Sequence, residues 1–255
     1  MSDETSQMAP GLIKAFAPQE EEVNEGGRRR RRTAADEAIA ALRSWTPKTR
    51  LGREVMANRI VTYEQAMASG LPIREVEIVD ALIPNLEDEI IKVNMVQRMT
   101  DSGRRVRFNV MACVGNKDGY VGLAMAKGKE VALTIRKALV AAKLNIIQIQ
   151  RGNGSWESSV GPGTSVPFKV QGQAGSTRVT LMSAPAGKGL VIGETGKRVL
   201  ELAGINDVLS RTKGQTRTTI NYAAATFNAL AEINRTRVKE TQRAELFIHK
   251  GRLIE

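Results

Sequence analysis

The sequence contains very few of the side chains that most catalytic and metal sites require. Its 255 residues include one cysteine and one histidine. A single cysteine excludes an internal disulfide and any cysteine-rich zinc site. One histidine leaves little for chemistry that needs two histidines or a nearby Cys/His pair. These two shortages argue against most metal and thiol enzymes.

Long apolar runs and aromatic residues are scarce as well. No stretch of about 18 uninterrupted apolar residues occurs, and the first thirty residues hold no apolar run of signal-peptide length. Aromatic residues make up only 4% of the chain, which argues against a platform that stacks single-stranded bases. Hydrophobic residues reach 42%, enough to bury a core. We therefore expect a soluble, intracellular, cytoplasmic protein.

Positive charge is in excess, and most of it lies in one block. The formal net charge is +11. Counted by segment, residues 1–50 carry +1, residues 51–90 carry −5 and residues 91–150 carry +8. A block this basic, within a sequence that has strand and helix periodicity, is typical of a folded surface that faces a polyanion. A solvated basic face that only aids solubility is the alternative.

Composition divides the chain into five parts. Residues 1–35, with an acidic stretch and five consecutive arginines, are expected to be a disordered arm that either threads into RNA or stays a solvated tail. Residues 36–85 alternate short helical stretches with breakers and predict a helical extension. Two domains are expected at 86–150 and 151–235. The charged residues 236–255 are expected to form a peripheral tail.

The first domain is predicted to be a three-stranded antiparallel sheet followed by one helix, which is a complete two-layer α+β module. Period-two alternation marks strands around 91–98, 105–114 and 121–125. Residues 100–103 have the composition of a hairpin turn. Residues 129–144 switch to helical spacing, with an apolar stripe and a basic ridge near which Leu133 and Val140 also fall.

The second domain is predicted to follow a polar, glycine-rich link at residues 151–163. Strand and helix patterns alternate in it. Strands are expected near 168–170, 178–182 and 208–212, and helices at 194–203 and 218–233.

Few residues of the chain invite a chemical role. Met111 and Cys113 alternate with core positions of a strand, and no base is placed beside the thiol, so both are interpreted as packing residues. His249 is expected to be an ordinary surface residue. Neither the dinucleotide-binding fingerprint nor the phosphate loop occurs in the sequence.

One glycine loop offers an enzymatic alternative. Residues 185–190, Pro-Ala-Gly-Lys-Gly-Leu, could present backbone N–H groups to phosphate, as small-molecule kinases with a Pro-x-x-x-Gly-Leu-Gly-Ser-Ser motif do. The similarity stops at Leu190, because Val191-Ile192-Gly193 replaces Gly-Ser-Ser. The alternative is thus a phosphoryl-transfer enzyme that uses residues 185–189.

A set of glycines, basic residues and apolar positions with characteristic spacing extends over both predicted domains. In the first domain its members are Gly103-Arg104, Phe108, Val114-Gly115, Gly119, Val121-Gly122, Lys127 and Lys129-Glu130-Val131. In the second they are Val166-Pro167, Pro185-x-Gly187-x-Gly189, Leu202-Ala203-Gly204 and Gly214-x-Thr216. This set resembles the small-subunit ribosomal protein five family over about residues 45–235, and the upstream segment Trp45-x-Pro47-x-Thr49-x-Leu51-Gly52-Arg53 looks like its archaeal and eukaryotic branch.

The resemblance implies a first domain similar to double-stranded-RNA-binding modules and a second domain that is an α/β sandwich. It also implies a non-enzymatic structural constituent of the small ribosomal subunit, without a cofactor. Members of the family bind small-subunit rRNA near the central pseudoknot, touch ribosomal proteins four and eight, help form the mRNA entrance and influence decoding accuracy. A free-standing double-stranded-RNA module remains a third possibility.

In the family the first hairpin loop reaches into rRNA. The resemblance places the corresponding contacts of this chain at Arg98, Gly103 and Arg104. This chain has Asp101 where bacterial members often place a lysine. Folded RNA is recognised largely through shape, 2′-hydroxyls and phosphates, which suits a basic hairpin and helix. The predicted rRNA-binding residues are Arg98, Gly103, Arg104, Arg105, Arg107, Lys117, Lys127, Lys129 and Arg136.

Overall fold

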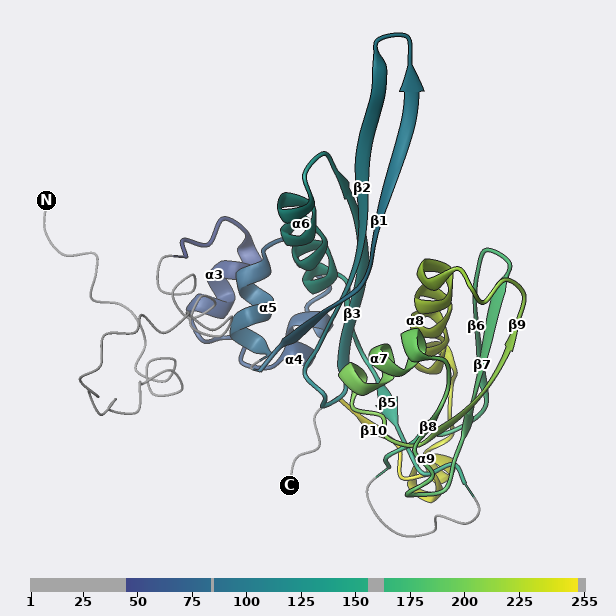
Figure 1. Cartoon of the computed structure of the whole chain (residues 1–255). Coiled ribbons are helices and arrows are strands. Elements are labelled where there is room, and N and C mark those ends of the chain that lie inside the picture. Colours follow the sequence, from purple (N-terminus) through teal and green to yellow (C-terminus); the bar gives the residue numbers. More distant parts are fainter. Residues whose placement is uncertain (1–44, 84, 156–162, 252–255) are drawn as a thin grey trace, which may run out of the picture. The chain divides into compact units, whose positions relative to one another are not determined.

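The computed structural model describes residues 45–83, 85–155 and 163–251 (Figure 1). The arm expected at residues 1–35 lies outside these residues. The chain divides into two compact units, residues 1–86 and residues 87–255.

The described part of the first unit consists of three short helices, as the frequent breakers predict. These are α3 (Arg50–Met56), α4 (Tyr63–Ala68) and α5 (Val76–Leu82). Polar caps start two of them, because the Thr49 hydroxyl accepts from the Gly52 N–H and Thr62 forms a capping box with Gln65. The helices enclose a small core of their own, made by Leu51, Val55, Ile60, Ala66 and Ile78.

Glu75 fastens the start of α3 to the segment before α5. Its carboxylate accepts hydrogen bonds from the indole N–H of Trp45 (2.8 Å) and from the backbone N–H groups of Lys48 (3.0 Å) and Thr49 (2.6 Å). Burial raises the pKa of Glu75, but these hydrogen bonds outweigh burial and hold it below its ordinary value of 4.5. Glu75 therefore links these two segments as a charged carboxylate.

The second unit begins with an antiparallel sheet in the order β1-β2-β3-β4. Its strands are β1 (Glu87–Thr100), β2 (Gly103–Gly115), β3 (Tyr120–Gly128) and β4 (Ile146–Gln148), with α6 (Val131–Leu144) between the last two. The prediction of three strands is therefore wrong, because the sheet has a fourth strand, β4. With only three residues, β4 is too short to show an alternation in the sequence.

Near β3 the sheet is buried on both faces. On one face Val110, Ala112 and Ala126 pack with Ala138 of α6. On the other face Met111, Cys113 and Leu123 belong to a larger core. The packing roles expected for Met111 and Cys113 are confirmed, and burial raises the pKa of the Cys113 thiol to about 12, with a smaller contribution from the charge of Glu89.

A second sheet, in the order β6-β7-β9-β8, lies in the C-terminal part. It comprises β6 (Val170–Ala174), β7 (Thr177–Ser183), β8 (Leu190–Val191) and β9 (Val208–Lys213), with helices α7 (Glu194–Ala203) and α8 (Thr219–Arg235). The predicted helices and the strands expected near 178–182 and 208–212 are confirmed. The strand expected near 168–170 lies later, at Val170–Ala174, and the two-residue β8 was missed. A Cβ at Gly172 would lie 2.2 Å from the Ala225 carbonyl oxygen, so glycine lets α8 pack directly on β6.

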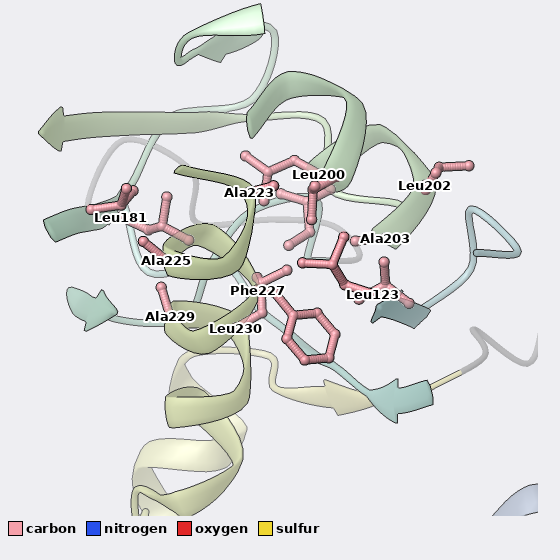
Figure 2. Close-up of a cluster of buried hydrophobic side chains, with 14 of the residues drawn as sticks. Leu123, Leu181, Leu200, Leu202, Ala203, Ala223, Ala225, Phe227, Ala229 and Leu230 are labelled. Carbon is pink, nitrogen blue, oxygen red and sulfur yellow. The ribbon is translucent and has the colours of Figure 1, made fainter. Parts of the chain in front are cut away.

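Helices α7 and α8 join the two sheets through one core. Figure 2 shows Leu123 of β3 beside side chains of both helices, among them Leu200, Ala203 and Phe227. The turn between β2 and β3 also caps α7, since the N–H of Lys117 donates to the Leu202 carbonyl at 2.9 Å. The protein is thus a two-domain α+β chain, and buried side chains of both domains pack together in one hydrophobic core.

The last residues are less peripheral than the sequence indicated. Helix α9 (Glu240–Glu245) is exposed, but β10 (His249–Lys250) pairs with β5 (Gln150–Arg151), and Ile248 is buried. The charged residues that suggested a peripheral tail are those of the exposed helix α9. The pairing of β10 with β5 uses backbone groups, so amino-acid composition could not predict it. His249 itself is exposed, as expected.

Candidate nucleic-acid interface

The first hairpin extends well beyond the rest of its sheet (Figure 1). Strand β2 pairs with β3 only over Phe108–Gly115, whereas its pairing with β1 continues to the turn at Thr100 and Gly103. Gly103 has φ +112°, a conformation that glycine adopts readily. The segment 96–107 therefore forms a two-stranded ribbon that no third strand of the sheet joins, and all its side chains are at least partly exposed.

Cross-strand register gives the ribbon two different faces. Directly opposed residues share a face, and neighbours along a strand lie on opposite faces. One side, here called the basic ribbon face, carries five cations, two asparagines and Val96. Its members are Lys92, Asn94, Val96, Arg98, Arg105, Arg107 and Asn109, with Lys127 of β3 opposite Asn109.

The other side of the ribbon is mainly apolar. Met95 is 64% exposed and Met99 is 70% exposed, both far above what a packed core side chain shows. The face comprises Val93, Met95, Gln97, Met99, Arg104, Val106 and Phe108. Arg104, opposite Met99 near the tip, is its one cation.

Two arginines face each other on the basic ribbon face. Arg98 is directly opposite Arg105 in the β1–β2 ladder, and both side chains are exposed. Like charges in directly opposed positions destabilise a sheet. An anion placed between two such guanidinium groups would relieve the repulsion and accept hydrogen bonds from both.

The structure thus brings together four of the predicted site residues, which are Arg98, Arg105, Arg107 and Lys127. Arg104 lies at the same end but on the opposite face. Lys92 was not among the predicted site residues, although its alternation with Asn94, Val96 and Arg98 was visible in the sequence.

The remaining predicted residues lie elsewhere on the domain. Lys117 is in the β2–β3 turn, at the far end of the sheet from the ribbon tip, and its ammonium pairs with Glu87 at 2.6 Å. Lys129 precedes α6 and Arg136 lies on α6, which packs on the sheet face opposite the basic ribbon face. Both side chains are exposed.

The apolar residues near the α6 ridge are not packed within the described part of the chain. Ala138 and Ala142 are fully buried and form the inner face of the helix, as the stripe predicted. Leu133 is 59% exposed and Val140 is 46% exposed, beside Arg136. The outer surface of α6 is therefore mixed rather than uniformly basic.

The glycine loop at residues 185–189 is occupied by contacts within the chain. The N–H of Gly189 donates to the buried carboxylate of Asp207 at 2.8 Å, and the N–H of Lys188 donates to the Pro185 carbonyl at 3.2 Å. These two backbone N–H groups are therefore not free to bind a phosphate. The adjoining pocket includes Glu194 and Tyr222, and neither lysine nor arginine occurs among the described residues that line it.

The described residues hold neither a cluster of potential metal ligands nor a helix that could span a membrane. No cluster of three potential metal-ligating His, Cys, Asp or Glu side chains occurs in residues 45–83, 85–155 and 163–251. No helix in the same residues is both long and apolar enough to cross a bilayer.

Comparison with known families gives two matches along the chain. The pattern described as Ribosomal protein S5, N-terminal domain, matches residues 86–150, and the one described as Ribosomal protein S5, C-terminal domain, matches residues 172–243. The second match includes the start of α9, beyond the limit of 235 expected for the second domain.

Three archaeal relatives, each called small ribosomal subunit protein uS5, align over most of their length. The protein of Methanospirillum hungatei is 55% identical over 194 residues, covering 76% of this chain and 95% of the relative. That of Methanococcoides burtonii is 56% identical over 186 residues, covering 73% and 88%. The protein of Haloarcula marismortui is 50% identical over 202 residues, covering 79% and 95%.

Such identity over most of each relative agrees with the two-domain architecture. The chain belongs to the ribosomal protein S5 family.

Proposed function

We propose that this chain binds small-subunit rRNA with the basic ribbon face and the tip of the β1–β2 hairpin. As a member of its family it is a non-enzymatic structural component of the small ribosomal subunit, working in translation on the cytoplasmic ribosome. The kinase alternative is accordingly wrong. The proposal concerns which surface meets the RNA.

The observation that carries the proposal is the ribbon itself. A two-stranded ribbon exposed on both faces gains little from apolar burial, and isolated hairpins are marginally stable in water. Here it holds Arg98 directly against Arg105 with Arg107 beside them, an arrangement that costs stability without a partner. Phosphate groups of folded RNA supply the missing anions.

The ribbon presents positive charge on both sides at its tip. Arg104 points away from Arg98 and Arg105, and Gly103 between the strands keeps the turn narrow. A narrow element with cations on both sides suits insertion between two segments of folded rRNA. We propose that Lys129 and Arg136 contact a further segment on the α6 side and that Lys117, already paired with Glu87, contributes least.

The finer placement follows the family resemblance. We propose that the protein lies near the central pseudoknot and the mRNA entrance, contacts ribosomal proteins four and eight, and supports assembly and decoding accuracy. The resemblance of the first domain to double-stranded-RNA-binding modules, a sheet with one helix packed on it, supports recognition of RNA shape and backbone rather than base sequence.

The test is charge reversal on the basic ribbon face. We expect Arg105→Glu/Arg107→Glu to weaken rRNA binding and to reduce incorporation into small subunits on a gradient at least tenfold. A matched control is Arg235→Glu/Lys239→Glu, which changes the net charge equally at exposed positions of the C-terminal part. Equal incorporation of the two variants would contradict the proposal.

A further inference from the structure

In the part of the chain that the structure describes, no element covers one face of the second sheet, and this face is basic. Alternation along β6, β7 and β9 places Val179 and Leu181 inside, where the sheet packs with α8, and the intervening residues outside. This outer sheet face is lined by Gln171, Gln173, Arg178, Thr180, Met182, Leu209, Arg211 and Lys213, and Val191 lies opposite Leu209 at one end.

No acidic side chain belongs to the outer sheet face. In the described residues 163–218 the only acids are Glu194, Glu201 and Asp207. Asp207 is buried, and the other two lie on α7. Among the described residues, no carboxylate pairs with Arg178, Arg211 or Lys213, so the face carries three uncompensated cations.

Helix α7 of the same domain shows the opposite arrangement. Lys197 pairs with Glu201 at 3.7 Å, and Arg198 pairs with Glu194 at 2.8 Å and with Glu89 at 3.2 Å. Surface charge that only aids solubility is usually mixed in sign, as it is on this helix. The outer sheet face carries positive charge only, so solubility alone does not explain its charge.

A second like-charge pair occurs on this face. Arg178 of β7 is directly opposite Lys213 of β9, and Arg211 lies two residues farther along β9. The Nε of Arg178 donates to Oε1 of Gln173 at 3.1 Å, which orients its guanidinium along the sheet. Arg178 and Lys213 repeat the relationship of Arg98 and Arg105 in the other sheet, in a separate domain.

We propose that the outer sheet face is a second RNA-binding surface, which takes the phosphate backbone of folded small-subunit rRNA. The inference rests on the proposed function and adds a surface to it. The occupant is identified by charge complementarity: three cations and two glutamines, without an acid, match a polyanion. No aromatic side chain lies on the face, so it offers no stacking for single-stranded bases.

The experiment compares salt dependence of rRNA binding for three proteins. These are the full-length chain, the outer-face variant Arg211→Gln/Lys213→Gln and the control Lys197→Gln/Arg235→Gln. The probe is a transcript of the small-subunit rRNA. Each lost phosphate contact on duplex RNA lowers the slope of log K against log salt by about 0.9, taking the value for B-form duplexes as a guide.

We expect the outer-face variant to lose about 1.8 in slope and at least fivefold in affinity at physiological salt, with the control unchanged. An unchanged slope in the outer-face variant, while Arg105→Glu/Arg107→Glu loses affinity, overturns this inference and leaves the proposed function standing. Failure of the wild-type chain to bind rRNA overturns both. If the outer-face variant binds rRNA normally but enters subunits poorly, the face binds a protein and the inference is wrong.

Discussion

The guanidinium of Arg151 donates a hydrogen bond to the carboxylate of Asp118 across 2.7 Å, joining β5 to the turn between β2 and β3. The Arg151 side chain is only 4% exposed. It also donates to the carbonyl oxygens of Gly204, after α7, and of Gly251, after β10. One buried side chain thus ties both domains and the C-terminal segment together.

We expect Arg151→Met to lower the free energy of unfolding by about 3 kcal/mol, the lower part of the range for breaking a buried ion pair. The cost stays in the lower part because Asp118 is 31% exposed and can regain water. Asp118→Asn should cost at least as much, because it leaves a buried guanidinium without its counter-charge. Urea denaturation followed by circular dichroism measures both, and a change below about 1 kcal/mol for Arg151→Met would contradict this role.

The Arg98–Arg105 pair predicts that stability and RNA binding oppose each other. Arg105→Thr removes the repulsion and adds a β-branched residue, so it should stabilise the free protein by up to about 0.5 kcal/mol while weakening rRNA binding. This gain in stability should be smaller in 1 M salt, because the Debye length is then about 3 Å and the repulsion between the two arginines of the wild type is already screened. Thermal melting and filter binding test the two effects.

A suitable control for Arg105→Thr is Gln97→Thr, on the apolar side of the same ribbon. It adds the same side chain without changing charge. If both variants are stabilised by the same amount, and if salt does not change that amount, β-propensity rather than charge repulsion explains the effect.

Cys113 should be unreactive in the folded protein. Its burial raises the pKa to about 12, so at pH 8 almost no thiolate forms, and the side chain has no exposed surface. Labelling by an aromatic disulfide reagent should therefore follow global unfolding and become complete in urea. Labelling in native buffer that is faster than unfolding would show that the shared core opens locally.

The elements that the sequence predicted well are those long enough to repeat a pattern. Helix α7 matches its expected bounds because its buried positions Gly196, Val199, Leu200 and Ala203 follow the helical spacing of three and four residues. Strands β8 and β10, with two residues each, have no period to detect. The burial of Met111 and Cys113 depends on α7 and α8, which are distant in sequence and pack against that face.

The candidate site was predictable in composition but only partly in arrangement. Charge counts identified the arginines of the hairpin, and Arg104, Arg105 and Arg107 were all predicted to bind rRNA. Strand parity separates Arg104 from the other two, and the register between strands sets Arg98 against Arg105. Lys117 could not be excluded from the predicted site in advance, because its pairing with Glu87 joins residues thirty positions apart.

The hydrogen bonds to Glu75 predict that acid destabilises the helical unit. A carboxyl group whose pKa is lower in the folded state contributes stability that is present above its unfolded pKa and is lost as pH falls through the folded value. Because the pKa of Glu75 lies below 4.5, that loss should begin near pH 4.5 and continue below it. The Trp45 indole N–H resonance, whose proton bonds to Glu75, reports it in the full-length chain.

Glu75→Gln serves as the matched control, because an amide keeps an acceptor oxygen but does not titrate. The variant should release Trp45 more readily at neutral pH, since a neutral acceptor binds the three N–H donors less strongly than a carboxylate does. Its melting temperature, followed at the same resonance, should change less between pH 6 and pH 3.5 than that of the wild type. The same acid dependence in both proteins would assign the effect to other carboxylates and remove Glu75 from this role.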